Sequence, residues 1–320
     1  MMNLANEIKD AVTIGIGGHI RPDGDCVGSS MALYLYIRKN FPEKDVHVFN
    51  EKAEDIFNCI KDIDKVEDAK SCKTKFDCFI AVDTAGDRLG DAEPLFAKAV
   101  KKINIDHHIS NPGTGDVNYI VPDASSASEL VYDVLDEKLI DKEIAMALYI
   151  GIIHDTGVLK YSNTSPKTLK IVANLIEFGF DFPKLIDETF YEKTYLQTMI
   201  LGRTLAESFL VMDGKVSVGR IDRKTMEFYN AEPYDLDGIV NQLRLIKGVE
   251  VGIFMYQLPS KAYKVSLRSR GIVDVARVAE IFGGGGHVRA AGCIVNEDYH
   301  DVINNLTAEI EKQLKGVVLD

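Results

Sequence analysis

Short strand-like segments with apolar centres recur through the first half of the chain and constrain its fold more than any other feature. They span Val12–Gly17, Asp45–Phe49, Phe76–Asp83 and Lys101–Asp106, and a helical pattern covers Cys26 to Lys39 between the first two. Strands that are apolar on both faces and alternate with helices are typical of a parallel sheet covered on both sides. The pattern therefore predicts an α/β fold whose amino-terminal part is a doubly wound, mainly parallel sheet.

The second half of the chain has a different pattern. A helical and relatively polar stretch over 187–209 is followed by shorter strand and helix patterns. Val249–Leu258 and Tyr263–Arg268 are joined by a short turn, which predicts a hairpin. A length of 320 residues favours two domains over one. We therefore expect a first domain over 1–186, a connecting helix over 187–209, and a smaller α/β mixed-sheet domain over 210–320.

The composition limits the partners of the chain. The formal charge is −12, which argues against a basic surface that coats long nucleic acid. A small anionic substrate is still compatible with this charge, because a bound cation can reverse the local field. The five cysteines form no CxxC pair, as is typical of reduced thiols in a cytoplasmic protein. No apolar run approaches the ~18 residues of a membrane span, so we expect a cytoplasmic protein with no membrane partner.

Acidic and imidazole side chains gather where the apolar runs of the first half end. The run HIRPDGD follows the first predicted strand, Asp83 ends the third, and the triplet DHH ends the fourth. The carboxyl ends of parallel strands meet at one edge of a sheet, where doubly wound folds bind their ligands. Asp155 ends a helix pattern and must be brought to that edge by tertiary packing. The candidate residues are His19, Asp23, Asp25, Asp83, Asp106, His107, His108 and Asp155.

Carboxylates crowded into a partly buried site repel one another, and divalent cations would remove that repulsion. Asp and His ligands without Cys fit Mn²⁺ better than a structural zinc. The ligands exceed the needs of one ion, whereas two ions roughly 3.5–4 Å apart that share one Asp would use them all. Each position alone also has an ordinary explanation, such as a turn at Asp23 and Asp25, a helix cap at Asp83, or solvated histidines.

At these residues the chain resembles the DHH phosphoesterase superfamily, which is named after the triplet that begins at Asp106. Asp155 stands in the expected Asp-Thr-Gly context. Near the carboxyl end, the run GGGGHVRAAG from Gly283 to Gly292 and the run SLRS from Ser266 to Ser269 resemble the DHHA1 substrate domain. The resemblance implies a catalytic, metal-binding DHH domain over 1–186 and a substrate-binding DHHA1 domain over 210–320.

The resemblance also implies a role for each candidate. His19, Asp23 and Asp83 would hold one ion, and Asp25, Asp83, His107 and Asp155 would hold the other, with Asp83 as the bridge. Asp106 would orient an imidazole, and His108 would face the phosphate and stabilise charge or protonate the leaving oxygen. Relatives usually carry a small hydroxyl residue before Asp155, where this chain has His154. That histidine is either an added ligand or, as we favour, a packed helix residue.

The glycine-rich run has two interpretations. Glycines permit positive φ and close backbone approach, so their N–H groups can line an anion or a nucleobase, whereas the alternative is a flexible hinge. The cations around the run favour a binding loop, in which Arg289 would add a bidentate phosphate contact. The expected substrate-binding residues are Arg268, Ser269, Gly284, Gly285, Gly286, His287 and Arg289.

Length and signature favour the compact branch of the superfamily that resembles oligoribonucleases and phosphatases of 3′-phosphoadenosine 5′-phosphate. The branch implies a hydrolase of phosphoester bonds in very short RNA, dinucleotides or bisphosphonucleosides. It would use two divalent cations, for which Mn²⁺ fits best and Mg²⁺ and Co²⁺ are alternatives. A phosphodiesterase of cyclic di-AMP or linear pApA and a non-catalytic nucleotide sensor are the competing hypotheses. A homodimer is left open.

Overall fold

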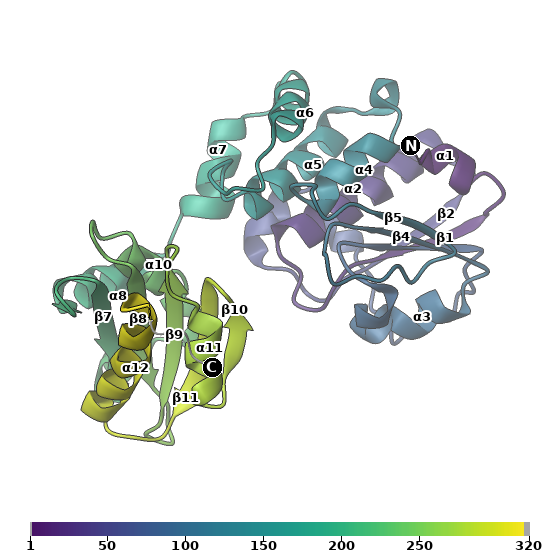
Figure 1. Cartoon of the computed structure of the whole chain (residues 1–320). Coiled ribbons are helices and arrows are strands. Elements are labelled where there is room, and N and C mark those ends of the chain that lie inside the picture. The colour runs from purple at the N-terminus through teal and green to yellow at the C-terminus, as the bar shows by residue number, and fades with distance from the viewer. Residues whose placement is uncertain (1, 317–320) are drawn as a thin grey trace. The chain divides into compact units, whose positions relative to one another are not determined.

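The computed structural model describes residues 2–316, and the chain divides into two compact units, Met1–Glu192 and Lys193–Asp320 (Figure 1). The boundary lies inside the predicted connecting helix, which is in two pieces. Asp187–Tyr191 forms a π-helical turn, Glu192 is extended, and α8 (Tyr195–Ala206) starts anew. Thr194 and Gln197 form a capping box at that start, which explains why the helix begins there rather than running on from 187. No helix among the described residues has the length and apolarity needed to cross a membrane.

The first unit is built on a five-stranded sheet in the order β2-β1-β3-β4-β5, in which every strand pair is parallel. All five residues of β3 are buried, as expected for a central strand of a sheet covered on both faces. The predicted α/β fold with a mainly parallel sheet is confirmed. The strands are β1 (Thr13–Gly17), β2 (Asp45–Phe49), β3 (Cys78–Val82), β4 (Lys101–Asp106) and β5 (Val117–Ile120).

Helices cover both faces of this sheet, so it is doubly wound (Figure 1). One face carries a large core shared with α2, α4 and α5, whereas Phe79 on the other face packs with Phe96 of α3. The helices are α1 (Leu4–Glu7), α2 (Gly24–Asn40), α3 (Glu93–Lys98), α4 (Ala127–Val134), α5 (Lys142–Asp155), α6 (Pro166–Ile176) and α7 (Phe182–Ile186). Short 3-10 helices are η1 (Asp55–Cys59), η2 (Ile63–Lys65), η3 (Gly86–Arg88), η4 (Gly90–Ala92) and η5 (Glu137–Leu139).

Close packing of α2 against α5 brings the start of α2 near the end of α5. A Cβ on Gly28 would lie 2.5 Å from the Ala147 carbonyl oxygen and 2.8 Å from the Gly151 nitrogen. Only a glycine therefore allows the two backbones to approach this closely. The contact matters for the site, because α2 carries Asp25 in its first turn and α5 ends at Asp155.

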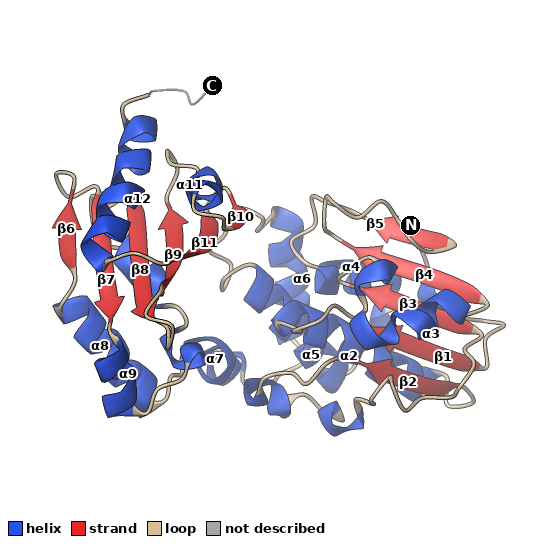
Figure 2. Cartoon of the chain, turned by 90° about the horizontal axis from the view of Figure 1, so that it is seen from below, coloured by secondary structure: helices blue, strands red, loops and turns tan. Residues whose placement is uncertain are grey.

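The second unit is a six-stranded mixed sheet in the order β10-β11-β9-β8-β7-β6 (Figure 2). Only β7 and β8 pair in parallel, and the predicted hairpin is confirmed as the antiparallel pair β8–β9. Helices α11 and α12 pack on one core, and α8 and α10 contribute to a second. The strands are β6 (Phe209–Val211), β7 (Val216–Ile221), β8 (Val251–Gln257), β9 (Tyr263–Ser269), β10 (Gly285–His287) and β11 (Ala290–Val295). The other helices are α9 (Arg223–Tyr229), η7 (Pro233–Leu236), α10 (Ile239–Arg244), α11 (Val275–Ile281) and α12 (Tyr299–Leu314).

Candidate metal centre

The acidic and imidazole candidates of the first unit come together at the carboxyl edge of its sheet. His19 follows β1, Asp83 follows β3, and Asp106 is the last residue of β4. Asp23 caps α2, and Asp25 lies in its first turn. Asp155 is the last residue of α5 rather than of a strand, so its position at this edge depends on helix packing. Parallel pairing and helix packing thus gather residues that are far apart in the sequence.

Asp83 lies at the middle of this cluster, between two histidines. Its Oδ2 is 3.4 Å from His19 Nε2, and its Oδ1 is 3.4 Å from His107 Nε2. The residue is 2% exposed, and Oδ1 has no hydrogen-bond partner. Its φ of 58° is left-handed, a conformation uncommon for a residue with a side chain. A buried carboxylate is costly unless positive charge compensates it, and one oxygen toward each histidine is an arrangement that fits a bridging metal ligand.

His19 presents one ring nitrogen to the carboxylates on its side of Asp83. Its Nδ1 lies 2.8 Å from the Ile20 carbonyl oxygen, so Nδ1–H donates there and Nε2 is the nitrogen that a cation could bind when the ring is neutral. Nε2 is 3.7 Å from Asp23 Oδ1. The same Oδ1 accepts hydrogen bonds from the Asp25 and Cys26 backbone N–H groups, which fix its position at the start of α2.

A second group of ligand atoms surrounds His107 Nε2. This nitrogen is 3.7 Å from Asp155 Oδ2 and 3.9 Å from Asp25 Oδ2. Asp25 is held rigidly, because its oxygens accept hydrogen bonds from the Ala127 and Ser128 backbone N–H groups at 2.6 and 2.9 Å. These amides begin α4, where the helix dipole favours a negative charge. The ligand atoms thus gather around two ring nitrogens, His19 Nε2 and His107 Nε2, and Asp83 presents one oxygen to each.

The Asp106 carboxylate holds the two histidines of the DHH triplet through hydrogen bonds. Its Oδ1 accepts from the backbone N–H groups of His107 and His108 and from His108 Nδ1, at 2.8, 3.2 and 2.7 Å. Its Oδ2 accepts from Asn111 Nδ2 at 2.6 Å. Asp106 is thus saturated by donors, whereas the side chain of His108 stays 52% exposed. Asn111 was not predicted from the sequence, although it follows the triplet closely.

The electrostatics of the cluster reflect burial of like charges. Burial and the nearby Asp83 carboxylate raise the pKa of Asp25, and burial with the same neighbour raises the pKa of Asp155 to about 6. Burial alone would lower the pKa of His107, but Asp83, Asp25 and Asp155 outweigh it and raise the pKa to about 10. Protons therefore compensate the carboxylates when no cation does, and cation binding would displace them.

The predicted substrate residues lie on β9 and on the β10–β11 hairpin of the second unit. Ala290 pairs with Arg268, and Ser269 N donates to the Arg289 carbonyl oxygen at 3.1 Å. The glycine run is neither a simple loop nor a hinge, because Gly285 and Gly286 form strand β10 with His287 at the sheet edge. Gly283, at a φ of 68°, follows the end of α11, a place that favours glycine.

Arg289 has a structural contact besides any role in binding. Its guanidinium donates through Nη1 to the Val273 carbonyl oxygen at 3.1 Å, which links the hairpin to the segment before α11. The side chains of Arg289 and His287 are exposed, whereas Ser269 is buried.

The family of the chain is decided by comparison with known proteins. The model of the DHH family, N-terminal domain, matches residues 13–152, and that of the DHHA1 domain matches residues 213–316. A probable bifunctional oligoribonuclease and PAP phosphatase NrnA of Streptococcus mutans is 31% identical over 313 residues, which cover 94% of this chain and 96% of the relative. This chain belongs to the DHH family. The first unit is its DHH domain, and the second carries its DHHA1 domain.

Two further likenesses extend over nearly the whole DHH–DHHA1 chain. A bifunctional oligoribonuclease and PAP phosphatase NrnA of Thermus thermophilus is 29% identical over 324 residues, covering 97% of this chain and 95% of the relative. The crystal structure of an exopolyphosphatase-related protein from Bacteroides fragilis superposes with a TM-score of 0.87 at 24% identity, covering 98% and 96% of the two chains. The second likeness shows that the fold is shared.

His154 and Cys26 both lie beside the DHH ligands. His154 packs between the rings of Phe57 and Phe190, its Nε2 lies 3.1 Å from Thr189 Oγ1, and burial lowers its pKa to about 4. It is therefore an uncharged packing residue, as favoured. Cys26 was not a candidate, yet its Sγ lies within 4.8 Å of ligand atoms of His19 and Asp83. Its position directly after Asp25 was the signal that could have revealed it.

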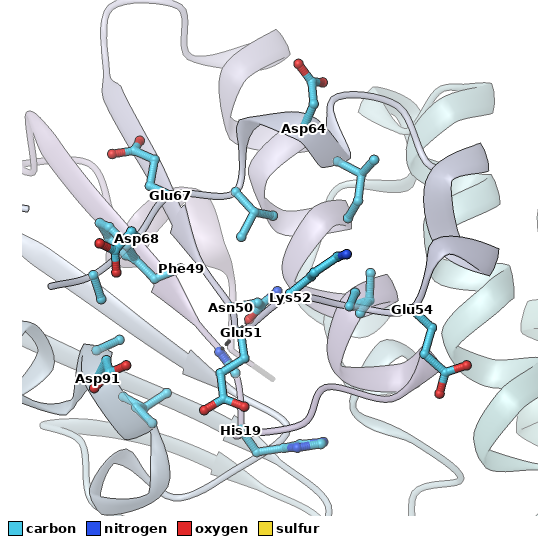
Figure 3. Close-up of a pocket in the computed structure, with 18 of the residues that line it drawn as sticks. His19, Phe49, Asn50, Glu51, Lys52, Glu54, Asp64, Glu67, Asp68 and Asp91 are labelled. Atoms are coloured by element: carbon cyan, nitrogen blue, oxygen red, sulfur yellow. Dashed lines mark hydrogen bonds between the residues drawn. The ribbon is translucent and has the colours of Figure 1, made fainter. Parts of the chain in front are cut away.

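Two cavities adjoin the DHH cluster, and His19 lines both. One, of about 780 Å³, is lined by Asp83, His108 and Arg88, so it offers a cation beside the cluster that the sequence did not single out. The other, of about 450 Å³, lies beyond His19 and is surrounded by carboxylates (Figure 3). The first cavity is acidic as well, but it adjoins Asp83 and His108, so cations bound at the cluster would make it suit a phosphorylated ligand. The acidic side chains around the other cavity are Glu51, Glu54, Asp55, Asp64, Glu67, Asp68 and Asp91.

Proposed function

We propose that this protein hydrolyses phosphoester bonds in very short oligoribonucleotides and dinucleotides. We propose that it also hydrolyses the 3′-phosphate ester of 3′-phosphoadenosine 5′-phosphate. The main observation in support of a metal-dependent hydrolysis is the buried Asp83 carboxylate, whose two oxygens lie 3.4 Å from His19 Nε2 and His107 Nε2. The choice of substrate is supported by the names of the two full-length relatives. We propose Mn²⁺ as the cation, with Mg²⁺ and Co²⁺ as alternatives.

The residues of the cluster divide into two proposed ligand sets. His19, Asp23 and Asp83 would hold one cation, and Asp25, Asp83, His107 and Asp155 the other. Divalent cations bound there would supply an acidified water and neutralise charge on a phosphoryl group. Asp106 acts as a positioning residue, since its carboxylate fixes the His108 ring and the backbone of both histidines.

His108 is the proposed proton donor to the leaving oxygen. Its hydrogen bond to Asp106 raises its pKa, which favours the protonated ring that a general acid needs. Because Nδ1 is held by Asp106, Nε2 is the nitrogen left to face a substrate in the cavity lined by Asp83 and Arg88. Arg88 would contact the phosphate there through its guanidinium.

The DHHA1 unit is proposed to bind the rest of the substrate. Edge strand β10 has backbone groups with no neighbouring strand on one side, and exposed His287 and Arg289 follow in the same hairpin. Backbone N–H groups and cations together suit a single phosphate or a nucleobase edge. The proposed contacts are Arg268, Ser269, Gly284, Gly285, Gly286, His287 and Arg289.

The experiment is a substrate panel on the purified protein, loaded in turn with Mn²⁺, Mg²⁺ and Co²⁺. The panel contains a dinucleotide, a pentanucleotide, a longer RNA, 3′-phosphoadenosine 5′-phosphate and cyclic di-AMP, and products are separated by chromatography. We expect mononucleotides from the short RNAs, phosphate release from the bisphosphonucleoside and little product from the longer RNA. No turnover of any short substrate with any of the metals would refute the proposal, and cyclic di-AMP as the preferred substrate would replace it.

A further inference from the structure

We propose that the Cys26 thiolate is an additional ligand of the cation at His19, which makes the two cation positions chemically unequal. The inference rests on the metal centre of the proposed function and extends it to a residue outside the expected ligand set. Its basis is geometric: Cys26 Sγ, a His19 ring nitrogen and an Asp83 carboxylate oxygen all lie within 4.8 Å of one another. Atoms this close can share one ion.

The local fold aims Cys26 at that position. The residue lies in the first turn of α2, one residue after Asp25, and is completely buried. Its Sγ is 3.9 Å from the His19 carbonyl oxygen, and Asp23 Oδ1 accepts a hydrogen bond from its backbone N–H at 3.1 Å. The turn that positions Asp23 therefore also positions the sulfur.

Asp83 is the carboxylate of the same group. The residue is 2% exposed, and its Oδ2 lies 3.4 Å from His19 Nε2, on the side of the carboxylate that faces the first cation position. A carboxylate buried this deeply requires positive charge nearby, which either the histidine rings or a cation can supply. The sulfur adjoins this carboxylate, whereas the equally buried Cys78 begins β3, at the opposite end of the strand that leads to Asp83. Cys78 therefore provides a matched control for a buried thiol remote from the cluster.

The thiolate would change which metals this position prefers. Sulfur is a soft ligand that favours Zn²⁺ and Co²⁺ over Mn²⁺ and Mg²⁺, whereas the group around His107 offers only carboxylates and imidazole. When the metal binds, the thiol proton leaves to solvent and the sulfur donates an electron pair, with no change of oxidation state. The position at His19 is therefore expected to be the thiophilic one of the pair.

A Co²⁺ titration of the full chain under reducing conditions tests the inference without an activity assay. The background is a chain with the partly exposed Cys59 and Cys72 replaced by serine, so that only buried thiols remain. We expect a near-ultraviolet sulfur-to-cobalt charge-transfer band in this background and in its Cys78→Ala variant. Cys26→Ala and Cys26→Ser should lose the band but keep the visible d–d bands of bound Co²⁺. Since even partners of metal ligands cost about 10–100-fold in affinity, losing the thiolate should raise the Co²⁺ dissociation constant at least about tenfold.

The outcomes separate this inference from the function on which it rests. Visible Co²⁺ bands without the charge-transfer band, or a charge-transfer band that persists in Cys26→Ala, would overturn the thiolate ligand and leave the metal centre intact. No Co²⁺ binding by the background chain would overturn the metal centre itself. Cys26→Ser nearly preserves side-chain size, so it covers the case in which Cys26→Ala fails to fold, and the spectrum of the background chain is decisive in either event.

Discussion

The DHH and DHHA1 units differ in how far their proposed functional side chains are buried. In the DHH unit, Asp25, Asp83 and Asp106 are buried at the ends of strands and helices. In the DHHA1 unit, the predicted contacts His287 and Arg289 are exposed on a hairpin at the edge of the sheet. Burial strengthens electrostatic interactions and fixes geometry, which suits a metal centre, whereas exposed cations suit capture of a mobile anion.

The largest expected effect is that of Asp83→Ala, which tests the buried side of this comparison. Both proposed cations lose a ligand, so kcat/KM with Mn²⁺ should fall at least about a thousandfold, or ~4 kcal/mol. Steady-state kinetics on a dinucleotide measures it. Asp64→Asn is the control, because Asp64 is an exposed carboxylate paired only with Lys65 on the rim of the acidic cavity. A loss as large in Asp64→Asn would mean that net charge, not the cluster, controls the rate.

Arg289→Ala tests the exposed side of the comparison, and Arg268→Ala tests the partly buried arginine on the neighbouring strand β9. If the two arginines bind the phosphate in the ground state, KM should rise roughly 10–100-fold while kcat changes much less, as expected for charge-assisted hydrogen bonds. Arg277→Ala is the control, since Arg277 lies exposed on α11 and its Nε is 3.7 Å from Asp274 Oδ2. A fall in kcat at unchanged KM would contradict a binding role for Arg268 and Arg289.

Gly286→Ala tests whether the glycine run is a packed strand rather than a flexible loop. At a φ of 149°, a Cβ there would lie 2.6 Å from Ala291 Cα and would also meet the Ala290 carbonyl oxygen. We expect the free energy of unfolding of the second unit to fall by ~1–3 kcal/mol in denaturant titrations. At the neighbouring Gly285 a Cβ meets nothing within 4 Å, so Gly285→Ala should change stability by less than ~0.5 kcal/mol. Equal losses would favour a conformational role for both glycines.

The smallest expected effect is a pH trend confined to the DHH unit. The folded state raises the pKa of His107 from 6.5 to about 10, so the protonated ring stabilises it fully below pH 6.5. That contribution is lost as the pH rises through about 10. The Tm of metal-free protein should therefore drop by several degrees across this window, at ~2–4 °C per kcal/mol. Saturating Mn²⁺ should flatten the trend in thermal melts, and His107→Gln should make it less steep, since the raised pKa of His19 and of His108 acts in the same direction. An equally steep trend in His107→Gln would assign it to those other groups.

Local patterns predicted most of the sheet and the acidic residues of the cluster. Strands Asp45–Phe49 and Lys101–Asp106 occur within the predicted bounds, because short segments rich in Val and Ile favour strands. Strand β5 and helix α6 were not predicted. In β5, partly buried Val117 alternates with exposed Asn118, a pattern too short to stand out. The glycine-rich β10 was also missed, since glycine has little strand preference of its own.

The sequence by itself determined which chemical groups stand at the ends of strands, because a strand end is a local property of a few neighbouring residues. Only the tertiary structure decided which atoms face one another. Sheet order and the close contact of α2 with α5 set the distances that join Asp83 to His19 and His107. The same packing buried His154 among aromatic rings and turned Cys26 toward His19, since contacts between distant segments depend on the whole fold.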